Sequence, residues 1–210
     1  MEVLHVSPEK ILVLTFTKDA ALSMQKRFIN QSEYSYPITF GTFHSCFYHI
    51  LKKSPGYKDI TLLTDTKKKE LIKKVMSKYT SEKDNREAEE LLAAISYYKN
   101  TNSKERSIDK VSARWQNLFL DVFREYEILR KAEQAMDFDD MVRECFCMLS
   151  ENGRILKEWR ERFSFILLDE FQDINPIQYN VIKLMAQKCG SVFAVGDDDQ
   201  SIYSFRGASP

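Results

Sequence analysis

The 210-residue chain is short of several residue types, and each shortage excludes a class of protein. Its four cysteines form no C-x-x-C pair and it has only three histidines, so a structural zinc site is not expected. No apolar run reaches the length of a membrane span, and no basic segment followed by a long apolar core marks a signal peptide at the N-terminus. We therefore expect a cytoplasmic protein with reduced thiols and no membrane partner.

An excess of charge of one sign is also lacking. Lys plus Arg and Asp plus Glu number 31 each, so the formal net charge is zero, and a nucleic-acid partner would have to be held by local patches. Hydrophobic residues make up 43% of the chain, which is enough for the core of one large domain or two small ones.

What the chain does have is two apolar runs that end abruptly in polar residues. The first, 163–168, is followed by Asp169 and Glu170, and the second, 191–196, is followed by three aspartates and Gln200. Each run predicts a buried strand of a parallel sheet with its polar groups at the carboxyl end. Ligands of open α/β sheets bind at that edge, and carboxylates there suit a hydrated Mg²⁺ that arrives with phosphates. The sequence therefore points to nucleotide chemistry.

The remaining pattern predicts two α/β segments separated by a helical one. Strands are expected at 11–16 and 38–40, and a helix at 18–30; a turn at 41–45 leads into a helix ending near 53. From 57 to 131 we expect no strand, but helices at 66–79, 85–100 and 111–131 with a polar loop at 101–107. A further helix runs from 137 to about 149, where Asn152-Gly153 stops it, and another starts at Asn175-Pro176. The expected domains are a lobe of residues 1–55 and 132–210 and an inserted helical subdomain of residues 56–131.

The polar groups after the two strands suit ATP hydrolysis. Asp169 could hold Mg²⁺ across the β- and γ-phosphates, Glu170 could position the attacking water, and the amide of Gln200 could contact the γ-phosphate. Beyond Gln200, Tyr203 and Phe205 offer rings for stacking bases and Arg206 a guanidinium for phosphate. The alternatives are a solvated strand end with capping acids, and aromatic side chains that anchor a loop to the core.

Four stretches together resemble the superfamily 1 DNA helicases of the UvrD/Rep/PcrA type. They are ILVLTFTKDAA at 11–21, GTFHS at 41–45, LDEFQD at 168–173 and VGDDDQSIYSFRGA at 195–208, with a weaker match in DFDDM at 137–141. Their order agrees with the family, and they span nearly the whole chain. The resemblance implies a P-loop NTPase-like parallel sheet flanked by helices, incomplete here, with an inserted all-helical subdomain.

The resemblance also implies a function and roles for individual residues. The chain would be part of an ATP-dependent helicase or translocase that acts on single-stranded DNA and on junctions of single and double strands, with ATP and Mg²⁺ as cofactors. Asp169 would bind Mg²⁺, Glu170 would polarise water and Gln200 would sense the γ-phosphate. The residues implied to contact DNA are Phe16, Thr17, Thr42, His44, Tyr203, Phe205 and Arg206. His44 could equally be a structural histidine.

The chain departs from the family pattern in three places. Phe205 stands where members often carry Trp, and Lys18-Asp19 where they usually carry Asn-Lys. None of the six glycines lies in G-x-x-x-x-G-K-[ST], the loop that cradles phosphates. In the family fold as we expect it, the strand feeding that loop lies between the two acid-tipped strands. We therefore expect these 210 residues alone to bind ATP and Mg²⁺ weakly or not at all, to be inactive and to need the remainder of a helicase. We also expect them to be weakly stable or to self-associate through unpaired strand edges.

The sequence also fits two other functions. A non-catalytic DNA-binding or interaction module would use the aromatic residues near Arg206 and the lysines at 67–69, 73 and 74, although that lysine run also fits a solvated helix face. A metal-dependent nuclease would use Asp169, Glu170 and Asp173, but three acids from one strand end converge poorly on shared ions.

Overall fold

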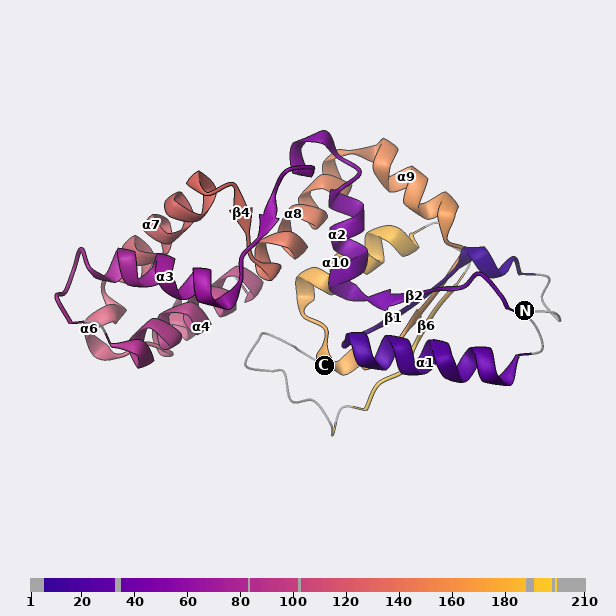
Figure 1. Ribbon diagram of the computed structural model, residues 1–210, viewed down its shortest axis with the longest axis horizontal. Coiled ribbons are helices and arrows are strands. Elements are labelled where there is room, and N and C mark those ends of the chain that lie inside the picture. The colour runs from indigo at the N-terminus through magenta and orange to yellow at the C-terminus, as the bar shows by residue number, and fades with distance from the viewer. Residues whose placement is uncertain are drawn as a thin grey trace. The chain divides into compact units, whose positions relative to one another are not determined.

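A computed structural model describes residues 6–32, 35–82, 84–101, 103–187, 191–197 and 199. The chain forms two compact units, and the first combines residues Met1–Pro55 and Val142–Pro210 whereas the second is Gly56–Met141. Figure 1 shows the helices and strands of both. Among the described residues no helix is long and apolar enough to cross a membrane.

The first unit is built on a four-stranded parallel sheet. Its strands lie in the order β2-β1-β5-β6, with bounds Thr39–Thr42, Ile11–Thr15, Phe165–Leu168 and Ser191–Ala194. Every neighbouring pair is parallel, and Leu14 of β1 lies opposite Gly41 of β2 and Leu168 of β5. All five residues of β1 are buried, as expected for a central strand with both faces covered. The predicted α/β class with a parallel sheet is confirmed.

Helices lie on both faces of this sheet. Helix α1 (Lys18–Gln31) connects β1 to β2, and α10 (Pro176–Ala186) connects β5 to β6 in the opposite direction along the strand order. Right-handed crossovers in opposite directions place two helices on opposite faces, as Figure 1 shows for α1 and α10. Helix α10 starts where predicted, because Asn175 caps it and Pro176 follows. The unit also contains α2 (Phe43–Leu51), α9 (Gly153–Arg162) and short 3₁₀ turns at Pro8–Lys10 and Phe171–Asp173.

Strand β6 differs from its prediction. It was expected to be buried, but all four of its residues are exposed, as is Val195 beyond it. The two acid-tipped strands were also expected to flank another strand, yet β5 pairs directly with β6 from Phe165↔Ser191 to Leu168↔Ala194. In the described part of the chain β6 is therefore an edge strand, and its apolar side chains remain largely exposed.

The second unit is mainly helical. Its helices are α3 (Asp65–Met76), α4 (Asn85–Thr101), α5 (Lys104–Ile108), α6 (Ala113–Gln116) and α7 (Phe119–Ala132), preceded by a 3₁₀ turn at Pro55–Tyr57. Their apolar faces meet in one core whose largest members are Trp115, Phe119 and Tyr126. Helix α8 (Phe138–Glu151) begins in this unit and continues into the other.

Several predicted element boundaries were wrong. A two-residue strand, β3 (Thr61–Leu62), pairs in parallel with β4 (Ala135–Met136), although no strand was expected from 57 to 131. The predicted helix 111–131 is two helices separated by a turn at 117–118, and the predicted loop 101–107 contains most of α5. Helix α9 was missed because Asn152 was interpreted only as a stop, whereas its side chain also accepts the Ile155 N–H and caps α9.

Candidate functional site

The carboxyl ends of the four parallel strands meet at one edge of the sheet. Phe16 and Thr17 follow β1, Thr42 ends β2, and Asp169 and Glu170 follow β5. The Asp169 N–H donates to the Leu14 carbonyl at 2.9 Å, which fixes the turn after β5 against the end of β1. The structure thus brings five of the ten predicted site residues to the same edge. The predicted residues Gln200, Tyr203, Phe205 and Arg206 lie outside the described residues.

The two acids after β5 have different environments. Asp169 is half-buried; burial, reinforced by the negative charge of Glu170, raises the pKa of its carboxyl above the ordinary value. Glu170 is exposed, and its backbone is left-handed, with φ 52° and ψ 47°. For a non-glycine residue this conformation costs ~1–2 kcal/mol, so the rest of the turn must hold it.

Gln172 provides contacts that hold this turn. Its amide donates to Glu170 Oε2 at 2.7 Å and accepts the backbone N–H of Asp197 at 3.0 Å. The Phe171 N–H also donates to the Val195 carbonyl at 2.9 Å. The turns after β5 and β6 are therefore joined by one side chain and by one backbone hydrogen bond. No role for Gln172 was predicted from the sequence; the signal available was an amide among carboxylates at 169–173.

Both threonines that were predicted to contact DNA, Thr17 and Thr42, cap helices. Thr17 Oγ1 accepts the Ala20 N–H at the start of α1, and Thr42 Oγ1 accepts the Ser45 N–H at the start of α2. Ser45 Oγ accepts the Thr42 N–H in return, and a Cβ on Gly41 would lie 2.9 Å from that oxygen. The sheet edge thus carries two capped helix N-termini, and the N–H groups of a helix N-terminus carry partial positive charge.

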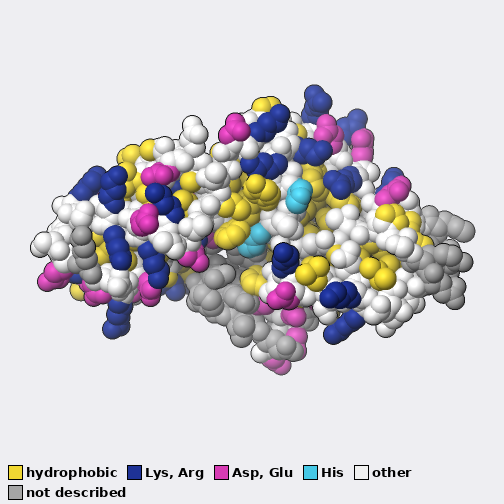
Figure 2. Space-filling view, viewed as in Figure 1, with side chains coloured by type: hydrophobic (Ala, Val, Ile, Leu, Met, Phe, Trp, Pro, Cys, Tyr) yellow, Lys and Arg dark blue, Asp and Glu magenta, His cyan; other side chains and the backbone are white. Residues whose placement is uncertain are grey.

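His44 is half-buried, in the first turn of α2. Figure 2 shows the two described histidines, both on α2, at the surface beside apolar side chains. On the face in view, Lys and Arg are interspersed with Asp and Glu. The described residues on that face therefore form no extended, uniformly basic surface.

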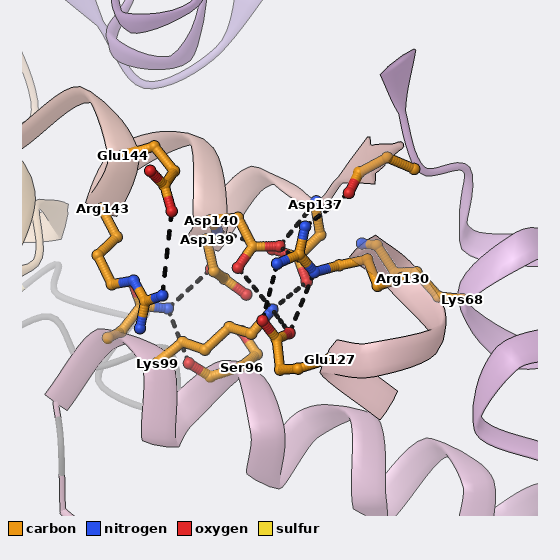
Figure 3. A network of polar contacts seen from close by, with 12 residues as sticks. Lys68, Ser96, Lys99, Glu127, Arg130, Asp137, Asp139, Asp140, Arg143 and Glu144 are labelled. Carbon is orange, nitrogen blue, oxygen red and sulfur yellow. Dashed lines mark hydrogen bonds and ion pairs between the residues drawn. The ribbon is translucent and has the colours of Figure 1, made fainter. Parts of the chain in front are cut away.

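A second polar cluster lies inside the helical unit, and Figure 3 shows it. Lys99 of α4, with its side chain 2% exposed, contacts Glu127 at 2.7 Å, Asp137 at 2.8 Å and Asp140 at 2.9 Å. Arg130 of α7 contacts Asp140 at 2.9 Å and donates to the Ala135 carbonyl at 2.6 Å. These contacts join α4 and α7 to the start of α8.

The charges in this ion cluster shift one another's pKa values. Burial alone would lower the pKa of Lys99, but the surrounding carboxylates outweigh it and raise that pKa. Lys99 in turn outweighs burial at Asp137 and holds the pKa of that carboxyl low. Burial and the negative charge of Asp137 raise the pKa of Asp140 to about 7. The sequence signal for the cluster was Lys99 itself, which lies at helical spacing from the buried residues Leu91 and Ile95.

Among the described residues, no group of three or more His, Cys, Asp or Glu side chains is arranged to hold a metal ion. Mg²⁺ seldom needs such a cage, because it keeps several waters and usually binds one or two carboxylates together with substrate phosphates. The single half-buried carboxylate of Asp169 fits that manner of binding.

Comparison with known proteins gives a match along the whole chain. Residues 1–210 match the model of the UvrD/REP helicase N-terminal domain. YjcD of Bacillus subtilis is 35% identical over 217 residues, which cover 100% of this chain and 28% of YjcD. The ATP-dependent DNA helicase Rep of Buchnera aphidicola subsp. Acyrthosiphon pisum is 34% identical, covering 97% of this chain and 32% of Rep. The ATP-dependent DNA helicase PcrA of Leuconostoc citreum is 29% identical, covering 98% of this chain and 28% of PcrA. The chain therefore spans about a third or less of the length of these relatives.

Proposed function

Because the chain belongs to the UvrD/Rep helicase family, we propose that it is part of an ATP-dependent DNA helicase or translocase that couples Mg²⁺·ATP hydrolysis to movement on single-stranded DNA. One observation carries the proposal. The ends of β1, β2 and β5 bring Phe16 and Thr17, Thr42, and Asp169 and Glu170 to a single edge of the sheet. An edge of this kind is where open α/β sheets bind their ligands.

The acids after β5 suit the nucleotide. Asp169 would hold Mg²⁺, whose positive charge neutralises the β- and γ-phosphate oxygens when it is bound. Asp169 is half-buried beside the negative charge of Glu170, and a bound cation would offset the burial and repulsion that raise the pKa of its carboxyl. Glu170 is exposed and within hydrogen-bonding reach of solvent, so it can orient the attacking water. The family resemblance adds Gln200 as the group that contacts the γ-phosphate.

The ends of β1 and β2 suit single-stranded DNA. Phe16 offers a ring for base stacking, and Thr17, Thr42 and His44 offer polar groups beside two helix N-termini. The family resemblance extends this track through Tyr203, Phe205 and Arg206. Junctions of single and double strands are the expected substrate of the whole protein.

We further propose that these 210 residues do not turn over ATP without the remainder of a helicase. Their six glycines include no G-x-x-x-x-G-K-[ST] sequence, so they supply neither its backbone cradle nor its lysine. Self-association is the accompanying proposal. Strand β6 presents an apolar edge on which Val192 is 45% and Phe193 62% exposed, and such edges pair with other chains.

Hydrolysis tests the motor assignment. Phosphate release from ATP is measured with and without single-stranded DNA, on the 210 residues and on the full-length gene product. We expect no release above the blank from the 210 residues. We expect DNA-stimulated release from the full-length product that falls by about 10²–10⁴-fold in Glu170→Gln. Stimulated release that survives Glu170→Gln would remove Glu170 from the mechanism, and its absence in the full-length wild type would leave only a binding module.

DNA binding tests the proposed track. The anisotropy of a labelled oligothymidylate is titrated with wild type, Phe16→Ala and His44→Ala at increasing salt. Stacking contributes about 1–3 kcal/mol per base, so Phe16→Ala should weaken binding at least fivefold. Phe138→Ala is the matched control, because Phe138 is an exposed ring in the other unit, 46% accessible. Equal losses in Phe16→Ala and Phe138→Ala would contradict the track.

A further inference from the structure

Gln172 occupies an unusual position for an amide at the sheet edge. It lies between the turns that follow β5 and β6, and only 2% of its surface is exposed. Both ends of its amide are used, since Nε2 donates to Glu170 Oε2 at 2.7 Å and Oε1 accepts the Asp197 N–H at 3.0 Å. A buried side chain with a carboxylate on one side and a backbone N–H on the other has a single satisfactory amide orientation.

The chemistry of the two partners selects glutamine. A glutamate at this position could still accept the Asp197 N–H, but its second oxygen would face the Glu170 carboxylate. An apolar side chain of similar length would leave the Asp197 N–H and the Glu170 carboxylate without these partners. An amide satisfies both, because its nitrogen donates to the Glu170 carboxylate and its oxygen accepts the Asp197 N–H.

The turn after β6 is built to let this amide approach. A Cβ on Gly196 would lie 2.7 Å from Gln172 Oε1 and 3.2 Å from the Gln172 backbone nitrogen. Only glycine therefore fits beside the amide without displacing it. The glycine before Asp197 and the glutamine after Glu170 form one packed unit, although they lie on different strand ends.

We infer that Gln172 is a positioning residue that holds the Glu170 carboxylate and ties its placement to the backbone at Asp197. Glu170 has an exposed side chain on a left-handed backbone, so without a partner its carboxylate would sample several rotamers. The hydrogen bond from Gln172 selects one of them. Because the same amide accepts the Asp197 N–H, a displacement of the turn after β6 moves or releases Glu170. The catalytic meaning of this link rests on the proposed role of Glu170 in orienting water.

The link predicts coupling that can be measured without any hydrolysis. Amide hydrogen exchange is followed by NMR on the 210-residue chain at the Asp197 N–H. The reference is the Val195 N–H, which donates to the Leu168 carbonyl at 2.8 Å. Loss of one hydrogen bond corresponds to roughly a five- to tenfold change in protection. We therefore expect Gln172→Leu to speed exchange at Asp197 by about that factor while Val195 keeps its rate.

The decisive variant is Glu170→Ala, which removes an exposed side chain and leaves Gln172 in place. If Gln172 transmits the position of Glu170, the Asp197 N–H should exchange at least twofold faster and its resonance should shift in Glu170→Ala. Neither change should appear when Glu170→Ala is added to Gln172→Leu. A Gln172 that only fills space between the turns predicts no effect of Glu170→Ala at Asp197, and that result would overturn the inference.

A matched control separates this link from general loosening of the fold. Gln178 is a buried glutamine of the same unit, and its side chain closes the capping box of α10. Gln178→Leu should reduce overall stability. Relative to wild type, it should speed exchange at the Asp197 N–H by no larger a factor than at the Val195 N–H. A selective effect of Gln178→Leu at Asp197 would also count against Gln172 as the link. The exchange result stands whether or not the protein hydrolyses ATP, so failure of the motor proposal and failure of this one are distinguishable.

Discussion

Asp137 and Asp140 cap helix α8 reciprocally, since the carboxylate of each accepts the backbone N–H of the other, at 3.2 and 2.8 Å. Lys99 lies against both carboxylates, so one buried ammonium holds the start of α8 in place. The arrangement places two like charges side by side in the interior. Both carboxylates are stabilised by the same nearby positive charge, and two of the predictions below follow from this.

Replacing Lys99 with methionine should strongly destabilise the helical unit. The substitution keeps most of the side-chain volume but leaves Asp137, Asp140 and Glu127 with one cation fewer, and breaking a buried pair in this way costs about 3–5 kcal/mol. Urea unfolding is followed through Trp115 in a Trp159→Phe background, so that the fluorescence reports this unit alone. Lys69→Met is the control, because its contact with Glu89 is solvent-exposed and should matter little. Similar losses in the two variants would contradict the prediction.

Asp140 should make the helical unit less stable as pH rises from about 5 to 8. Its pKa is raised to about 7, so over that window the folded state binds a proton that the unfolded state has already released. The free energy of unfolding should therefore fall toward pH 7 and then level off. The groups facing Asp140 are Lys99, Glu127, Arg130 and Asp137, and both acids among them have lowered pKa values, so their titration lies below the window.

The Asp140→Asn variant checks this pH dependence. Without a titrating group at position 140, the free energy of unfolding should change less between pH 5.5 and pH 8 than in the wild type. Unfolding curves of both proteins are compared at the two pH values. The same pH dependence in both would assign the effect to other groups.

Relief of the strained backbone at Glu170 should stabilise the first unit. Glycine adopts φ near 52° without a steric penalty, so Glu170→Gly should raise the free energy of unfolding by about 1 kcal/mol while removing the proposed water-orienting group. Glu90→Gly, inside α4, should instead lower it by about 1 kcal/mol. Thermal and urea unfolding measure both. A loss of stability in Glu170→Gly would mean that the contact with Gln172 outweighs the strain.

Gly196→Ala should destabilise the same unit. The added methyl group would press against the Gln172 amide, and overpacking of this kind costs roughly 1–3 kcal/mol. Gly153→Ala provides the comparison, since nothing lies within 4 Å of a Cβ at the start of α9. Urea unfolding should separate the two variants clearly. Equal stability of both would show that the turns after β5 and β6 part easily.

Phe193→Lys should reduce self-association of the 210-residue chain. Phe193 is 62% exposed on the edge strand β6, and a charge there opposes pairing with another strand. Sedimentation velocity over a concentration series should show oligomers of the wild type that Phe193→Lys lacks. Ile128→Lys, at a 65% exposed position on helix α7, should leave association unchanged. A wild type that remains monomeric throughout would contradict the proposal.

The sequence predicted local features better than the neighbours of each element. The position of Asp169 and Glu170 at a strand end followed from an apolar run that stops abruptly, and the start of α10 followed from Asn175-Pro176. The exposure of β6 did not follow, because an apolar strand shows what could be buried and not which neighbour covers it. The Lys99 cluster depends on residues about 40 positions apart, a relationship that helical periodicity cannot supply.

The capping role of Thr17 and Thr42 restricts what these side chains can recognise. A threonine hydroxyl has one proton and two lone pairs, and at both positions one lone pair already holds a helix N–H. Each hydroxyl keeps its proton and one lone pair, and an incoming phosphate oxygen could accept that proton. On the proposed DNA track, contacts of this kind would hold the sugar–phosphate chain independently of the base sequence.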